Sequence, residues 1–508
     1  MAVAARLAVI LRHGGLDGNF GYDAGVYFAG SDSFVHGRLP YRDFVLIHPP
    51  ALMLLLSPFA LLTHVVTDET VFTTTVVAFT VLGGVNAVLV MRVVRGLGLG
   101  LRAATAAGLF YALWFGAIGS EYLIKPEPAG NLFLLLALLA TLRARRDGPL
   151  HWPLLTGVAL GTMMSVKIWW VVPAAGVLLW FARRTRSGRQ VAAAAGGVVL
   201  AGLLVDGPFF VDSPHAMWSS VIEDQTSRGA ISRSPWTRLS DLSSVPRLTG
   251  ALSHSTAELV SVGLLVALAW LVRRAWDVPA ARPVAALLVA QLVVLLLAPS
   301  WFPYYADYIA VAAAVTVGAA AHPHRTAPGP QTAARETRRL LRPVAAGWLF
   351  TLAVAAVSIP ALVDGRDAVP PFTGAAALTR ATAHVRCVMS DSPMGQIEID
   401  ALSRSLADGC RNWVDVTGRT YGPDRASVPR VANRRWQRDL TAYLRSGGAV
   451  LIVRQHGTGI APQTRRAIAR DGTLARAGGH RVYLVRHRST GPARRHPTHH
   501  PQAGARRQ

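Results

Sequence analysis

Long apolar runs alternate with short clusters of arginine, and this alternation constrains the fold more than any other feature of the sequence. Hydrophobic residues make up 51% of the chain and charged residues only 16%. The runs are long enough to cross about 30 Å of hydrocarbon as helices. The sequence therefore predicts an α-helical polytopic membrane protein. The expected spans are 70–92, 102–118, 128–142, 152–167, 168–182, 190–207, 256–272, 283–299, 305–321 and 343–362.

The net charge of +24 would indicate nucleic acid as the partner of a soluble protein. Here the basic residues lie mostly in short links between apolar runs, as membrane topology requires, so we expect a lipid bilayer and no nucleic acid. Almost all of them are arginine, and only Lys125 and Lys167 are lysine. This bias is typical of a GC-rich bacterium, so a bacterial cell membrane is the expected location.

Charge also predicts the orientation. The apolar stretch 49–66 contains prolines and fits either a short span or a helix on the membrane surface. If it does not cross, five short links with about 18 arginines fall on one side, and the longer loops opposite carry about nine basic residues. The positive-inside rule makes those links cytoplasmic. We therefore expect about eleven spans, a cytoplasmic N-terminus and an outer loop that contains Asp23.

The first apolar helix, 2–11, would be about 15 Å long, which is about half of a span. A signal peptide would need a basic start and a small-residue cleavage site, and neither is evident. We expect that in-frame codons upstream of Met1 encode about ten more apolar residues. A stop codon directly before Met1 would contradict this expectation.

Polar residues gather in the predicted outer segments. The loop 22–50 holds Asp23, Asp32, Asp43 and His48 among aromatic residues. A carboxylate beside hydrocarbon is costly, so such a residue indicates a functional site. The alternative is a solvated loop whose aspartates cap short helices.

Both lysines also fall in outer segments, in GSEYLIKPEP (119–128) and at the turn around Lys167. A compact ammonium group suits an anionic lipid headgroup, which predicts phosphate binding. The alternative for Lys167 is that its head reaches water beside Trp169 and Trp170.

From about residue 363 the sequence predicts a small α/β domain. Strands are expected in HVRCVMSD (384–391), NWVDVTG (412–418), GAVLIVRQ (448–455) and HRVYLVRH (480–487), and helices near 398–408, 434–446 and 462–476. We divide the chain into a membrane module (1–362), an extracytoplasmic α/β domain (363–490) and a disordered basic tail (491–508).

Cys387 and Cys410 are the only cysteines, and both lie in the predicted extracytoplasmic domain. That compartment permits a disulfide, which would add about 3 kcal/mol by closing a loop of roughly 24 residues. A buried pair of ordinary cysteines is the alternative.

Three stretches resemble the GT-C membrane glycosyltransferases that use polyprenyl-phosphate sugars. They read YDAGVYFAGSDSFVHGRLPYRDFVLIHPP, EYLIKPEPAGNLFLLLALL and LGTMMSVKIWW. The resemblance covers residues 20–320 and includes an acidic loop, a surface helix after it and a second acidic position that opens the fourth span. The elements DSP (391–393) and GCxxxVD (409–415) resemble actinobacterial members with an appended outer domain.

The resemblance implies an inverting transfer of a sugar to an extracytoplasmic glycan, glycolipid or protein. The family's loop aspartate falls on Asp23, its acidic residue at the fourth span on Glu127, and its phosphate-contacting lysine on Lys167. Where some relatives carry another lysine, this chain has His48, so Lys125 or an arginine of the outer loops is expected to compensate.

The chemistry is consistent with this assignment. A lipid phosphate is a good leaving group, so the reaction needs a base for the acceptor and cations for the phosphate. We expect Asp23 to be the base and Glu127 to orient the acceptor or hold Lys125. No DxD-like pair stands out, so neither a metal nor a cofactor is expected.

Aromatic residues are expected to line the substrate site by stacking on sugar or lipid. The alternative is an interfacial aromatic belt. These residues are Tyr22, Tyr27, Trp301, Tyr304 and Tyr305.

Two other classes of protein remain as alternatives. A lipid-linked sugar flippase or transporter would show internal repeats and polar residues in mid-span, and we find no repeat. A non-catalytic scaffold would use its outer domain to bind cell-wall polymer. Deleting 373–508 should leave a transferase some transfer or donor hydrolysis and should abolish a scaffold's function.

Overall fold

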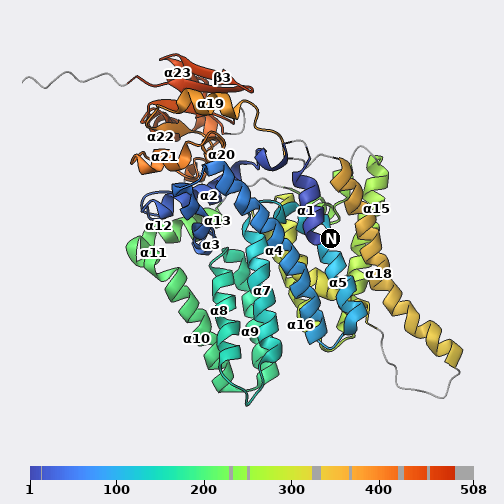
Figure 1. Cartoon of the computed structure of the whole chain (residues 1–508). Coiled ribbons are helices and arrows are strands. Elements are labelled where there is room, and N and C mark those ends of the chain that lie inside the picture. Colours follow the sequence, from blue (N-terminus) through green and yellow to red (C-terminus); the bar gives the residue numbers. More distant parts are fainter. Residues whose placement is uncertain are drawn as a thin grey trace, which may run out of the picture.

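The computed structural model describes residues 1–12, 14–227, 233–248, 252–322, 333–364, 369–420, 428–454 and 458–486. A bundle of long helices carries a small α/β domain at one end, which we call the domain end (Figure 1). The expected tail, 491–508, lies outside the described residues.

The bundle helices coincide closely with the apolar runs of the sequence, because each run must hydrogen-bond its own backbone where no water is available. They are α1 (Ala2–Ile10), α4 (Asp68–Gly96), α5 (Gly100–Leu113), α6 (Phe115–Glu121), α7 (Pro126–Arg143), α8 (His151–Met164), α9 (Val171–Thr185), α10 (Gly188–Val205), α15 (His254–Trp276), α16 (Arg282–Leu297), α17 (Ala310–Ala320) and α18 (Ala333–Asp364).

Among the described residues, three helices are long and apolar enough to cross a membrane, namely α4, α10 and α15. The pair α5 and α6 makes a fourth if it is counted as one span, bent by 55°. The expected count of about eleven spans is therefore not confirmed.

Short elements fill the domain end of the bundle. They are η1 (Gly15–Asp17), η3 (Ile168–Trp170), α11 (Gly207–Asp212), α12 (Pro214–Trp218), the π-helix η4 (Ser219–Glu223), α13 (Asp224–Thr226), α14 (Pro235–Leu242), η5 (Val245–Leu248) and η6 (Pro303–Ile309).

The polar stretch 22–50 begins as a helix, so its prediction as a loop was wrong. Helix α2 (Tyr22–Val35) has Asp23 in its first turn. Ala24 and Phe28, one turn apart, are fully buried and fix the helix on the core. Asp32 does not cap a helix, because it is buried and accepts a hydrogen bond from Thr63 Oγ1 at 2.8 Å.

The stretch 49–66 forms α3 (Ala51–Ala60) and a 3-10 turn, η2 (Leu61–His64). At 1.5 Å per residue this unit is about 20 Å long, too short to cross as a straight helix. It follows α2 at the domain end, where Figure 1 shows the two helices together.

The C-terminal domain contains a four-stranded sheet in the order β1-β2-β4-β3. Strand β1 (Val388–Ser390) runs parallel to β2 (Ala449–Ile452), and β4 (His480–Leu484) is antiparallel to β2 and to β3 (Thr473–Ala477). The remaining elements are α19 (Ala375–Thr382), α20 (Pro393–Glu398), α21 (Leu402–Ala407), η7 (Gly418–Thr420), η8 (Arg430–Ala432), α22 (Arg434–Leu444) and α23 (Pro462–Ala469). Cys387 and Cys410 form a disulfide, with their Cα atoms 5.7 Å apart.

Two expected elements of this domain were wrong. NWVDVTG is no strand of the sheet, because its Asp415 side chain accepts hydrogen bonds from Thr417 and Gly418 and so forms a local turn. The expected helix 462–476 ends at Ala469, and Gly472, at φ +101°, turns the chain into β3.

The C-terminal domain packs closely on the bundle. Met394 and Val414 belong to the same buried apolar cluster as Phe28 of α2. A Cβ atom on Gly25 would lie only 2.7 Å from the backbone nitrogen of Met394, so only glycine permits this approach. The turn that holds Asp415 is thereby fixed against the start of α2.

Candidate active site

A cavity with about 400 Å³ of empty space lies between the bundle and the C-terminal domain. That volume includes open solvent at the mouth of the cavity, and the enclosed part measures about 30 Å³. Five parts of the chain form its walls: α2, the stretch before α3, the segment before η3, η6, and the 415–417 turn. The lining residues are Tyr22, Asp23, Val26, Tyr27, Ile47, His48, Lys167, Tyr304, Tyr305, Asp415 and Thr417.

Asp23 is the accessible carboxylate of this cavity. Lys125 Nζ donates to Asp23 Oδ2 at 2.7 Å, and Tyr304 Oη donates to the same oxygen at 2.9 Å. The ammonium group also lies 3.8 Å from the centre of the Tyr304 ring. The Lys125 side chain is only 5% exposed, whereas that of Asp23 is 42% exposed. These contacts orient the carboxylate and leave it open to the cavity.

A second ion pair lies deeper. Lys167 Nζ donates to Glu127 Oε1 at 2.7 Å, and the two side chains are 3% and 1% exposed. Lys167 Nζ lies 4.1 Å and 4.2 Å from the ring centres of Trp169 and Tyr305. The ammonium group is therefore held between the Glu127 carboxylate and the two aromatic rings. It does not extend into water beside Trp169 and Trp170, which was the alternative expected for Lys167.

The remaining predicted residues form the other walls. The rings of Tyr27 and His48 stack with their centres 5.9 Å apart. Burial, together with the charge of Asp415, raises the pKa of Tyr22 well above its ordinary value, so the phenol stays protonated. Tyr22 Oη donates to Asp415 Oδ1 at 2.7 Å.

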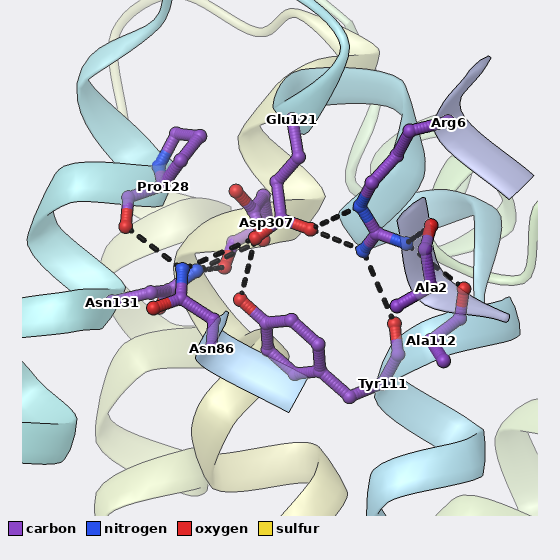
Figure 2. Close-up of polar contacts among 9 residues, drawn as sticks. All are labelled: Ala2, Arg6, Asn86, Tyr111, Ala112, Glu121, Pro128, Asn131 and Asp307. Carbon is purple, nitrogen blue, oxygen red and sulfur yellow. Dashed lines mark hydrogen bonds and ion pairs between the residues drawn. The ribbon is translucent and has the colours of Figure 1, made fainter. Parts of the chain in front are cut away.

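A buried network of polar side chains lies beside the cavity, and it was not predicted from the sequence. We call it the sealed network. Arg6 of α1 is fully buried and pairs with Glu121, as Figure 2 shows. Glu121 Oε1 also accepts hydrogen bonds from Tyr111 Oη at 2.8 Å and Asn86 Nδ2 at 3.2 Å. The available signal was that Arg6 is the only charged residue of the apolar stretch 2–11.

The same network ties α7 to η6. Asn131 Nδ2 donates to Asp307 Oδ1 at 2.9 Å (Figure 2). Glu127 lies one turn before Asn131 on α7, and Tyr304 lies one turn before Asp307 on η6. The network thus holds together two elements that supply residues to the site.

The structure brings together all eight predicted catalytic and substrate-binding residues. Six line the cavity, namely Tyr22, Asp23, His48, Lys167, Tyr304 and Tyr305. Lys125 and Glu127 lie behind it and hold Asp23 and Lys167. Of the other expected aromatics, Tyr27 lines the cavity and Trp301 does not.

Trp301 donates to Asp241 instead, at 2.6 Å. Asp415 and Thr417 were not predicted to belong to the site, although Asp415 is part of the GCxxxVD element. Within the described ranges no group of three or more His, Cys, Asp or Glu side chains is arranged to hold a metal. The expectation of a metal-free reaction stays a prediction.

Comparison with known proteins gives the family. The chain resembles the solved structure of ArnT from Cupriavidus metallidurans bound to undecaprenyl phosphate, with 16% identity, a TM-score of 0.58, and coverage of 95% of this chain and 96% of that one. At this identity the likeness shows the fold. The archaeal oligosaccharyltransferase AglB from Archaeoglobus fulgidus, in complex with an inhibitory peptide and a dolichol-phosphate, has 14% identity, a TM-score of 0.47 and coverage of 89% and 68%.

No curated protein sequence matches the chain. The model of glycosyltransferase family 87 matches residues 46–300, which is half of the chain. The matched range contains Lys125, Glu127 and Lys167 and ends just before Trp301. The chain therefore belongs to glycosyltransferase family 87 and is a membrane glycosyltransferase with a GT-C-like fold.

Proposed function

We propose that this enzyme moves a sugar from a polyprenyl-phosphate donor to a hydroxyl group of a cell-envelope acceptor, with inversion. The proposal rests on one observation: the accessible carboxylate of Asp23 and the buried ammonium group of Lys167 line the same cavity. These two groups supply the base and the cation that the transfer requires.

Lys167 is assigned to the donor phosphate. As the bond between the anomeric carbon and the phosphate oxygen breaks, its electron pair leaves on the phosphate, and a nearby ammonium group stabilises that charge. A buried lysine is costly to desolvate, which is difficult to explain in a scaffold. The lipid-phosphate donor is also consistent with the ligand of ArnT, which is undecaprenyl phosphate.

Asp23 is assigned to the acceptor. The acceptor oxygen attacks the anomeric carbon, and its proton passes to a carboxylate oxygen of Asp23. Lys125 and Tyr304 hold this group in one orientation, which favours a single productive geometry. One displacement of this kind inverts the anomeric centre.

The cavity is assigned to the outer face of the membrane. It lies at the domain end of the bundle, whereas the short links that join α7 to α8 and α9 to α10 lie at the far end (Figure 1). Those links carry arginines, so the positive-inside rule makes the far end cytoplasmic. The C-terminal domain is then extracytoplasmic and the N-terminus cytoplasmic.

The test is to replace Asp23 with Asn, which preserves shape and removes the base. Transfer is measured from a panel of radiolabelled polyprenyl-phosphate sugars in membranes that contain equal amounts of protein. We expect a loss of roughly 100-fold to 10,000-fold.

The matched control is Asp43→Asn, which removes an equally charged group whose partner is Arg42 and which does not line the cavity. It should stay within about threefold of the parent, because no catalytic proton passes to it. If Asp23→Asn works within that limit while Asp43→Asn or Glu127→Gln abolishes transfer, the base has been misassigned.

A further inference from the structure

We infer that the C-terminal domain supplies the acceptor subsite, where Asp415 binds a hydroxyl group of a neutral sugar at the end of a glycan acceptor. The inference rests on the proposed function and narrows it from any cell-envelope acceptor to a glycan.

The two oxygens of Asp415 have different surroundings. Oδ1 accepts three hydrogen bonds, from Tyr22 Oη at 2.7 Å, Gly418 N at 2.7 Å and Thr417 Oγ1 at 3.1 Å. Oδ2 accepts none from the part of the chain that the structure describes. The residue is only 3% exposed, yet it lines the cavity. Oδ2 is therefore available as an acceptor at the cavity wall, and a sugar hydroxyl in the cavity would donate to it.

The position of this oxygen is fixed relative to the proposed base. Thr417 N donates to Tyr22 Oη at 3.0 Å, and Val414 forms a backbone bridge with Val45 of the membrane module. Tyr22 directly precedes Asp23 in α2. An acceptor held by Asp415 is therefore held close to Asp23 as well, which lowers the entropic cost of the reaction.

Charge is divided across the cavity in a way that selects the acceptor. Lys167 lies on the membrane side and suits the donor phosphate, whereas Asp415 lies on the C-terminal side and repels an anionic group. The acceptor is therefore neutral where it meets Asp415.

The number of hydroxyl groups favours a glycan over a protein. A serine or threonine side chain has one hydroxyl, which the proposed base must use, so only backbone N–H groups of a protein acceptor would be left to donate to Asp415 Oδ2. A sugar presents several hydroxyls and can satisfy both carboxylates at once. Rejection of a ligand that leaves a buried polar group unpaired is a strong source of specificity.

The test uses the full-length protein in nanodiscs, with octyl glycosides of neutral hexoses and pentoses as acceptors. Asp415→Asn keeps the shape and an oxygen for the three donors, and replaces Oδ2 with an amino group that cannot accept. We expect the KM for the neutral glycoside to rise by about 10-fold to 100-fold. The kcat at saturating glycoside should fall much less. The control, Asp439→Asn, changes an exposed carboxylate of the same domain and should leave KM unchanged.

Two results would overturn the inference. The first is an acceptor KM that is unchanged in Asp415→Asn. The second is an equal loss of two rates in that variant, hydrolysis of the donor by water and transfer to the glycoside. An equal loss would mean that Asp415 acts through Asp23 or the donor. Folding is checked by the thermal midpoint, and if the variant misfolds, the unaltered protein decides the question.

The unaltered protein should use at least one neutral glycoside with a kcat/KM at least about tenfold above those of octyl hexuronides and of octanoyl peptides that contain serine and threonine. A preference for the hexuronide or the peptide contradicts the inference, as does the failure of every neutral glycoside while the donor is still hydrolysed. A protein that neither hydrolyses nor transfers any donor counts against the proposed function itself.

Discussion

The cations of the two ion pairs at the cavity are lysines and that of the Glu121 pair is Arg6; all three are buried, yet they differ in kind. Lys125 and Lys167 each bind one carboxylate and face aromatic rings. Arg6 binds Glu121 and also donates to the backbone oxygens of Ala2 and Ala112 at 2.9 Å and 3.0 Å. Arginine's planar group can hold several fixed partners, whereas lysine is a compact charge that can be redirected.

The difference between the two clusters indicates two roles. Arg6 joins α1 to the bend between α5 and α6, and its donors are committed to the fold. Lys167 lines a cavity, where a phosphate can compete with Glu127 for its charge. A cation that binds a substrate is thus a lysine with one carboxylate partner, whereas a cation that only holds helices together is an arginine with several fixed partners.

Glu398 adds a third case, a buried carboxylate for which the described residues provide no ion pair. It is 3% exposed, and its Oε2 has no hydrogen-bond partner among the described residues. The three cases predict three different responses to substitution.

The largest effect on stability is expected from breaking the Arg6–Glu121 pair. Arg6→Met leaves Glu121 buried and unpaired, so the free energy of unfolding should fall by about 3–5 kcal/mol. Thermal unfolding in nanodiscs measures it. The double variant Arg6→Met with Glu121→Gln should regain most of the stability and also the transfer activity. A double variant that is stable but inactive would show that the pair takes part in the chemistry.

Breaking the cavity pair should affect activity most. Lys167→Met removes the proposed phosphate cation, so transfer should fall by about 100-fold to 1,000-fold. Adding Glu127→Gln should restore stability, because no unpaired charge remains, but should not restore transfer. If this double variant transfers at the parental rate, Lys167 is structural, as Arg6 is.

The smallest effect concerns Glu398 and depends on pH. Burial, with Glu69 and Asp17 nearby, raises its pKa from 4.5 to about 9. Between these values the folded protein holds a proton that the unfolded chain has released, so the free energy of unfolding falls as pH rises, by about 1.4 kcal/mol per pH unit at most.

Glu398→Gln cannot ionise, so stability measured from pH 5 to pH 8 should show less of this slope. Glu258→Gln, at a carboxylate whose side chain is 48% exposed, is the control and should keep the slope. An unchanged slope in Glu398→Gln would mean that Glu398 is ionised in the folded protein.

Much of the fold and part of the site followed from the sequence. The helix positions could be predicted because a run that lies in hydrocarbon must be apolar over its whole length. Asp23, Glu127 and the two lysines stood out because charge beside hydrocarbon is costly. Arg6 met the same criterion and was overlooked, since its helix is short and its partner lies 115 positions away.

The sequence by itself determined which segments are helices of a membrane protein. It also determined which charged residues lie beside hydrocarbon and are therefore candidates for a functional site. Only the tertiary structure decided how they pair: Asp23 with Lys125, Glu127 with Lys167, and Tyr22 with Asp415, which are 393 positions apart. Apolar length is a local property that a run of residues carries alone. A hydrogen bond between distant residues depends on how every intervening element packs, and no local pattern records that.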